Sequence, residues 1–292
     1  ISLGAAGVQL LAIIAFVVAG LSPELAMVAS IAGSAAGALA YWLVIPKRTP
    51  SSVPPQPPHA GTTYGALART GLRIHGASLG IPLMLGIDIL LVAAFADDRA
   101  VGLYSLAAAL ANLVFLGVNV IAQAALHTQT VADESSAARF TAEFTRMGCV
   151  CSAGIATITI VASYPLVRVV YGEDFVGSVV PLIILTLAAI AFAIETPLRS
   201  FLYRAKGPGL VSTYAGVGLA LNVVLNIALI PALGIEGAAL ASLLSYWVYA
   251  SILLLRFRAL TDIGISEIVR FNRAELWKIT RTLKRQSGES GR

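Results

Sequence analysis

The residues that could carry chemistry are polar side chains set within long apolar stretches. Asp88 is the one charged residue between Ile74 and Ala96. An ionised aspartate at the centre of a membrane-spanning helix costs about 2.5–3.5 kcal/mol on insertion scales, so it must face a cavity, find a partner or be protonated. Two interpretations stay open: an acid that contacts substrate or couples to a proton or cation, and a structural hydrogen bond to a neighbouring helix.

Two polar stripes accompany this acid. The longer stripe has offsets of 0, 7, 14 and 18 residues and consists of Ser105, Asn112, Asn119 and Gln123. At 100° per residue these offsets cover about 40° of a helix. Such a stripe could line a hydrated path or bond to a partner helix, and its length favours the path. Asn222 and Asn226 form a shorter stripe, for which hydrogen bonds between helices are favoured, although both are also candidate path residues.

The sequence lacks the motifs of soluble enzymes. It contains no Gly-rich phosphate loop, no His-Glu-x-x-His and no Gly-x-Ser-x-Gly, and its three histidines are scattered. The pair Cys149 and Cys151 is more typical of small apolar fillers than of a metal site. We therefore predict no enzyme, no catalytic residue, no metal and no cofactor.

The elements that position these side chains are membrane-spanning helices. The 292 residues are 58% hydrophobic and 12% charged, with a mean hydropathy of +0.84. Their apolar blocks are long enough to cross about 30 Å of hydrocarbon as helices and lack the alternation of barrel strands. The sequence predicts an all-α polytopic membrane protein with about eight spans.

The basic residues are divided between the two sides of the membrane. When loops are assigned alternately, one side receives 18 of the 20 Lys and Arg residues, and the other receives Arg99 and Arg168. By the positive-inside rule the side richer in basic residues, which includes the C-terminal tail, faces the cytoplasm. We therefore expect the chain in the inner (cytoplasmic) membrane with its C-terminus in the cytoplasm. This distribution argues against nucleic-acid binding.

Several charged side chains are expected at the cytoplasmic mouth. They are Arg73, His75, Glu195, Arg199 and Arg204. Arg73 and His75 could meet an anionic head group, although ordinary anchoring explains Arg73 equally well. Glu195 precedes Arg199 by four residues, which favours a local ion pair, and Pro197 between them is expected to disturb the helix.

The chain is predicted to have four parts. They are two helices in 1–45, a Pro-rich cytoplasmic linker at 46–69, a six-helix unit at 70–258 and a basic tail at 259–292. Within the unit the expected spans are 73–95, 101–126, 148–168, 179–199, 209–231 and 235–257. The tail combines apolar residues at helical spacing with basic residues elsewhere, which favours an amphipathic helix on the inner leaflet over a solvated tail.

A series of short motifs resembles a known family. The series is Ile87-Asp-Ile-Leu-Leu, Val101-Gly-Leu-Tyr-Ser-Leu-Ala, Val170-Tyr-Gly-Glu-Asp-Phe-Val-Gly-Ser, Asn222-Val-Val-Leu-Asn-Ile-Ala-Leu-Ile-Pro and Gly234-Ile-Glu-Gly-Ala-Ala. In this order the motifs resemble the polysaccharide and O-antigen flippases of the multidrug/oligosaccharidyl-lipid/polysaccharide exporter superfamily. The resemblance covers about residues 70–257.

The resemblance implies a two-lobe transporter that moves lipid-linked saccharide between leaflets by alternating access. The six-helix unit would be the second lobe, and the first two helices would end a first lobe of which about four helices are missing. The implied partners are the bilayer, a lipid-linked saccharide, a coupling proton or cation, and polysaccharide assembly proteins. Two alternatives stay open, a cation- or proton-coupled multidrug antiporter and a non-transporting membrane scaffold.

Overall fold

The structure is a computed structural model that describes residues 64–131, 134–264 and 267–268. The side chains of residues 64, 66–79 and 117–135 are not among those described. The chain divides into two compact units, Ile1–Thr62 and Thr63–Arg292. All described residues belong to the second unit. The two helices expected in 1–45 and most of the expected tail helix lie outside the described residues.

The second unit is built from long helices. In chain order they are α3 (Tyr64–Phe95), α4 (Asp98–Val131), α5 (Glu134–Leu166), α6 (Val179–Ala189), α7 (Ala191–Lys206) and α8 (Pro208–Leu260). Two short turns, η1 (Val167–Tyr171) and η2 (Glu173–Ser178), join α5 to α6. No strand occurs in the described part of the chain, which fits segments whose backbone must satisfy its own hydrogen bonds in lipid.

Several of these helices are long and apolar enough to cross a membrane. Among the described residues four stretches qualify, Asp98–Leu116, Ser136–Tyr171, Glu173–Lys206 and Pro208–Leu260, and Gly80–Phe95 is a shorter apolar helix. The 53 residues of α8 would extend about 80 Å if straight, more than twice the hydrocarbon thickness. Instead α8 bends at Gly234, whose φ of 61° and ψ of −138° are not helical. The expected all-α, multi-span fold is confirmed.

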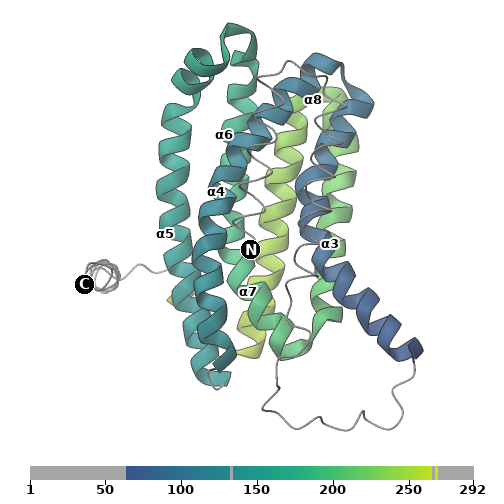
Figure 1. Ribbon diagram of the computed structural model, residues 1–292, viewed down its shortest axis with the longest axis vertical. Coiled ribbons are helices and arrows are strands. Elements are labelled where there is room, and N and C mark those ends of the chain that lie inside the picture. The colour runs from purple at the N-terminus through teal and green to yellow at the C-terminus, as the bar shows by residue number, and fades with distance from the viewer. Residues whose placement is uncertain (1–63, 132–133, 265–266, 269–292) are drawn as a thin grey trace, which may run out of the picture. The chain divides into compact units, whose positions relative to one another are not determined.

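Helices α3, α4 and α5 run alternately in opposite directions, α6 and α7 follow one another in the same direction as one interrupted span, and α8 runs back and then returns (Figure 1). The α3–α4 turn, the α5–α6 connection and the bend of α8 therefore lie at one end of the unit, and the α4–α5 and α7–α8 turns lie at the other. Arg99 and Arg168 belong to the first end, whereas Arg139, Arg204 and Lys206 belong to the second. The described residues thus follow the division of basic charge seen in the sequence.

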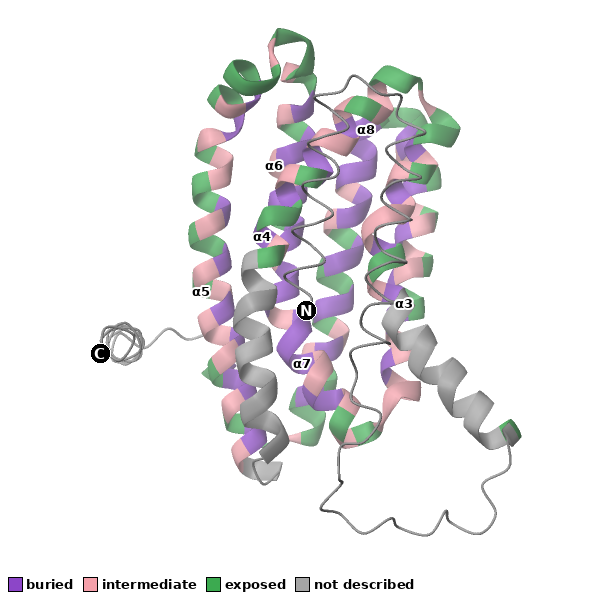
Figure 2. Cartoon of the chain, viewed as in Figure 1, coloured by how far each residue is buried: buried purple, intermediate pink, exposed green. Residues whose placement is uncertain are grey.

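The protein core lies around α6, α7 and α8 (Figure 2). In the most apolar 18-residue stretch of Glu173–Lys206, 50% of the residues are buried, whereas in the corresponding stretch of Ser136–Tyr171 only 22% are buried. Helices α6 and α7 are therefore central, and α5 is peripheral. One buried cluster includes Met84, Phe192 and Tyr249, and a second includes Val92 and Tyr104. Most exposed residues of this unit are apolar and lie on faces that we assign to lipid.

Two sequence expectations are wrong in detail. Helix α3 begins at Tyr64, within the segment expected to be linker up to Arg69, because the residues from Tyr64 onward contain no proline until Pro82 and favour a helix. Pro197 does not interrupt α7, which is helical from Ala191 to Lys206. The interruption lies at Ile190, where the Ala193 amide donates to the Ile190 carbonyl at 3.0 Å.

Candidate functional site

Asp88 occupies the buried face of α3. Met84, Asp88 and Val92 are spaced by four residues, so they lie on one face of the helix, and their exposed fractions are 0%, 2% and 0%. Met84 packs in one core cluster and Val92 in the other. The carboxyl group therefore lies between the two apolar clusters of the unit, where a charge is strongly disfavoured unless it is compensated.

The carboxyl group of Asp88 accepts hydrogen bonds from two other helical segments. Its Oδ2 accepts from the Tyr104 hydroxyl of α4 at 2.6 Å and from the Ser242 hydroxyl of α8 at 3.0 Å. Its Oδ1 accepts from the backbone N–H of Ile89 at 2.9 Å. These donors are neutral, so they orient the carboxyl group and supply no countercharge. A proton or a small cation could supply it.

The network continues from Ser242 into both limbs of α8. Asn222 donates through Nδ2 to the hydroxyls of Ser242 and Ser245, at 3.3 and 3.0 Å. Asn226 donates through Nδ2 to the backbone carbonyl and the Oδ1 of Asn222, at 2.9 and 3.1 Å. All four side chains are fully buried. Within the described part of the chain Asn226 Oδ1 has no hydrogen-bond partner, so the network ends in an open acceptor.

The bend of α8 creates this arrangement. Asn222 and Asn226 belong to the limb before Gly234, whereas Ser242 and Ser245 belong to the limb after it. The bend folds the second limb back beside the first, so polar side chains 20 and 23 residues apart meet. We define the Asp88 network as Asp88, Tyr104, Asn222, Asn226, Ser242 and Ser245.

A small cavity adjoins the network. It has a volume of about 20 Å³, and its lining includes Asp88, Asn112 and Tyr246. A space of this size holds about one water molecule, which requires polar partners such as the Asp88 carboxyl and the Asn112 amide. Asn112 is exposed, so the cavity lies between the buried acid and the surface of the unit.

The structure describes the side chains of two members of the longer polar stripe. Asn112 shares the cavity with Asp88, and Ser105 is half-buried and has no part in the Asp88 network. The side chains of Asn119 and Gln123 lie outside the described ones. Asn222 bonds to the second limb of α8, which is the kind of contact favoured for it on sequence grounds, whereas Asn226 bonds to Asn222 within the first limb.

Sequence reasoning missed Tyr104, Ser242 and Ser245. A signal for Tyr104 was present, because Asp88 lies seven residues before the end of α3 and Tyr104 lies six residues after the start of α4. In an antiparallel pair of helices, Asp88 and Tyr104 would therefore lie at nearly the same distance from the α3–α4 turn and so face each other. Ser242 and Ser245 gave no comparable signal, since the register of the two limbs depends on the bend of α8.

Replacing Tyr104 by phenylalanine tests how firmly the carboxyl group is held. The variant Tyr104→Phe removes the shortest of its hydrogen bonds and leaves the ring in place. We expect a loss of about 1–2 kcal/mol in the free energy of unfolding, the usual effect of leaving one buried partner unsatisfied. Unfolding in mixed micelles with rising SDS content would measure it, and Tyr164→Phe, at an exposed tyrosine, is the control.

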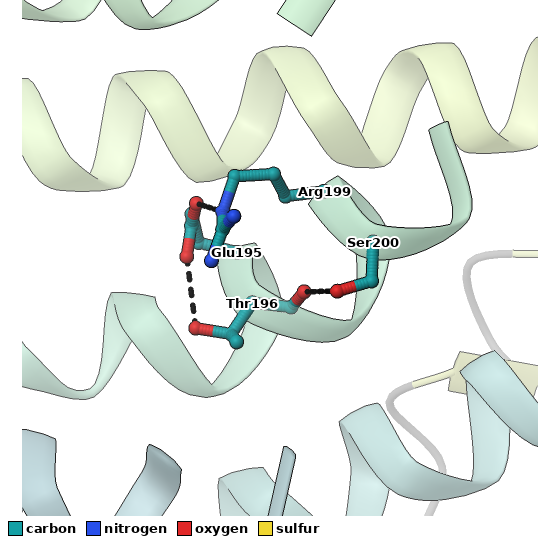
Figure 3. A network of polar contacts seen from close by, with 4 residues as sticks. All are labelled: Glu195, Thr196, Arg199 and Ser200. Carbon is teal, nitrogen blue, oxygen red and sulfur yellow. Dashed lines mark hydrogen bonds and ion pairs between the residues drawn. The ribbon is translucent and has the colours of Figure 1, made fainter. Parts of the chain in front are cut away.

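A second polar group lies in α7 (Figure 3). The Arg199 Nε donates to Glu195 Oε1 at 2.6 Å, and Thr196 donates to Glu195 Oε2 at 2.8 Å. The carboxylate is 2% exposed and the Arg199 side chain is 31% exposed. The local ion pair expected from the sequence is therefore present, with its acid buried and its base reaching toward the surface.

Removing Glu195 alone is expected to destabilise the protein more than removing the whole pair. Breaking a buried ion pair typically costs 3–5 kcal/mol, and partial exposure of Arg199 reduces this to roughly 2 kcal/mol. We expect Glu195→Ala to show this loss and the double variant with Arg199→Met to recover at least half of it. The same SDS titration would measure both, and equal losses would contradict an unpaired-charge effect.

Three further charges were expected at the same mouth. Arg204 is exposed near the end of α7, and the side chains of Arg73 and His75 lie outside the described ones. Within the described residues, no three His, Cys, Asp or Glu side chains gather as a metal site would require. Cys149 and Cys151 are free and half-buried.

The fold and the buried polar network define a multi-pass α-helical membrane protein. Residues 1–180 match the profile of the family described as polysaccharide biosynthesis protein. This match covers more than half of the chain, and the chain belongs to that family. A search of curated proteins gave no match.

Solved structures resemble the chain at low identity. An outward-facing multidrug resistance MATE family transporter of the MOP superfamily is 21% identical with a TM-score of 0.49, over 74% of this chain and 50% of that one. A MOP superfamily transporter from Pyrococcus furiosus is 19% identical with a TM-score of 0.48, over 72% and 49%. A MATE in complex with MaL6 is 21% identical with a TM-score of 0.42, over 74% and 52%. The chain thus spans about half the length of these structures.

Proposed function

We propose that this chain is part of a transporter that moves lipid-linked oligosaccharide across the cytoplasmic membrane for cell-surface polysaccharide synthesis. The family to which the chain belongs is the observation that carries this proposal. A multi-span helical unit suits the task, because a sugar attached to a lipid must pass its polar part through hydrocarbon while its lipid stays in the bilayer. Assembly proteins of the polysaccharide would be partners.

The Asp88 network supports a proton- or cation-coupled cycle. Alternating access requires an element with two arrangements whose balance a ligand can change. The network joins α3, α4 and both limbs of α8 around one acid whose neighbours donate only neutral hydrogen bonds. Adding or removing one positive charge at Asp88 would change the free energy with which these segments hold together. The open acceptor of Asn226 adds a candidate ligand oxygen for a cation.

The substrate path in this proposal passes Asn112 and the inner end of α7. Asn112 is exposed beside the cavity at Asp88. Arg199 reaches the surface with about a third of its side chain exposed and, with Arg204, could meet the anionic phosphates of a lipid-linked sugar. The positive-inside rule puts this end, and the C-terminus, in the cytoplasm.

Cation- or proton-coupled multidrug antiport is the alternative function. The buried carboxyl group of Asp88 favours it as much as it favours sugar transport, because both need a coupling acid. The two differ in substrate, so the experiment must detect the substrate directly.

The test uses the complete gene in its own host. We would delete the gene and quantify lipid-linked saccharide on each face of the inner membrane, then restore the wild-type protein. Accumulation on the cytoplasmic face, reversed by the wild type, is the expected result. If no lipid-linked saccharide accumulates, the flippase proposal fails, and drug efflux measured in the same strains would then decide between an antiporter and a non-transporting scaffold.

A further inference from the structure

A groove separate from the Asp88 network runs along the peripheral side of the unit. Its volume is about 490 Å³. Helix α5 lines it with residues three and four apart that include Arg146, Val150 and Ala153, and α8 lines it with Trp247, Ser251 and Leu254. Ile190 and Ile194, on either side of the start of α7, form its floor. Three helices thus each present one stripe, so the groove follows the helix axes.

The groove suits an apolar chain and not water. Arg146 is its one charged lining residue, and most of the others are aliphatic. Cavities with an apolar lining stay dry and take apolar guests. Val150 and Trp247 are each 38% exposed, so the groove opens at the surface of membrane-spanning helices. The surrounding medium there is hydrocarbon.

The two ends of the groove differ in chemistry. Arg146, Leu254 and Ile268 lie toward the end where α5 begins and α8 finishes, which is the end rich in basic residues. The Arg146 Nη1 donates to the backbone carbonyl of Glu267 at 2.5 Å, which holds the guanidinium at this mouth. Ala153 and Trp247 lie toward the membrane interior. The cationic end therefore meets the head-group region and the apolar end meets acyl chains.

We infer that this groove binds one acyl chain of an anionic phospholipid, with the lipid phosphate at Arg146. The groove supplies a dry apolar channel of the right direction, and the guanidinium supplies a charge complementary to the phosphate. This inference does not depend on which substrate the transporter moves.

The bound chain would contact the interruption between α6 and α7. Trp247, at the inner end of the groove, donates through Nε1 to the Leu187 carbonyl at 3.2 Å. In an uninterrupted helix that carbonyl would accept from the backbone N–H of residue 191. Trp247 thus stabilises the interruption, and a lipid that packs on the indole acts on the same point.

Fluorescence quenching can test the inference in the full chain. The variant with Trp42→Phe and Trp277→Phe keeps Trp247 as its one tryptophan. It would be placed in phosphatidylcholine vesicles that contain increasing fractions of brominated phosphatidylglycerol or, separately, brominated phosphatidylcholine. We expect half-maximal quenching at a roughly fivefold lower fraction of the anionic lipid, which is the selectivity that one basic residue supplies near a membrane surface.

Three substitutions on α5 provide the controls. Ala153→Phe fills the groove and is expected to remove the high-affinity quenching by anionic lipid. Ile158→Phe enlarges a residue of α5 that is 70% exposed and does not line the groove, and it is expected to leave the quenching unchanged. Arg146→Gln is expected to abolish the preference for the anionic lipid while the brominated chains still quench.

Two results would overturn the inference. Equal quenching by the two brominated lipids in the protein with intact Arg146 would exclude selection of an anionic lipid. Equal effects of Ala153→Phe and Ile158→Phe would exclude the groove as the site. Because Arg146→Gln changes a residue at the groove mouth, it tests the head-group contact even if Ala153→Phe does not fold.

Discussion

Under the proposed coupling role of Asp88, its replacement by asparagine is expected to reduce ion-coupled transport strongly and to leave the fold intact. Asparagine has nearly the same shape, and its carbonyl oxygen can still accept from the hydroxyls of Tyr104 and Ser242. It cannot bind a proton or balance a cation. Because an ionised aspartate at the centre of a membrane helix costs about 2.5–3.5 kcal/mol on insertion scales, a change in the charge of Asp88 can shift a conformational equilibrium by roughly tenfold or more.

Transport in reconstituted vesicles would measure this effect. With a lipid-linked saccharide as substrate and an imposed proton or sodium gradient, we expect the initial rate of Asp88→Asn to fall to about a tenth of the wild-type rate or less. Asp97→Asn is the matched control, because Asp97 is exposed and its Oδ1 accepts from the Ala100 amide, a contact that asparagine keeps. If the Asp88→Asn variant transported at the wild-type rate and its transport still required the ion gradient, Asp88 would have a structural role and not a coupling role.

The sequence was sufficient to predict that the second unit consists of membrane-spanning helices. Uncharged blocks of spanning length are unambiguous because a charge within hydrocarbon is costly, so each gap between charges marks a span. The expected spans 209–231 and 235–257 coincide with the two limbs of α8, which meet at the bend at Gly234. Asp88 also stood out, since a lone acid in an apolar block needs a partner.

The partners of Asp88 could not be predicted in the same way. Whether Ser242 reaches the carboxyl group depends on how α8 bends at Gly234 and how its second limb packs against α3, which are tertiary facts. The interruption at Ile190 was equally hidden. Its sequence, Ala-Ala-Ile-Ala-Phe, holds neither glycine nor proline, and Trp247, far along the chain, bonds to the carbonyl of Leu187.

Replacing Gly237 by alanine is expected to disrupt the unit more than the same change at any other described glycine, because its added Cβ would make the closest contact. A Cβ at Gly237 would lie 2.3 Å from the carbonyl oxygen and 2.6 Å from the carbonyl carbon of Leu229. Both are backbone atoms, so no side-chain rotation can relieve the clash, and the two limbs of α8 would have to separate. Ser242 and Ser245 lie on the displaced limb, so their bonds to Asn222 would be lost as well.

The cost of Gly237→Ala should therefore reach or exceed about 3 kcal/mol, the upper end for overpacked cores. We expect a lower yield of monodisperse protein and a fall in Tm of several degrees, measured by size-exclusion chromatography after heating. Gly216→Ala is the matched control, because Gly216 also lies in α8 and a Cβ there meets nothing within 4 Å. That variant should be neutral or slightly stabilised, since alanine favours a helix more than glycine does. Equal Tm values for the two variants would mean that the limbs of α8 are not in close contact at Gly237. The alignment of Ser242 and Ser245 with Asn222 would then have to depend on other contacts.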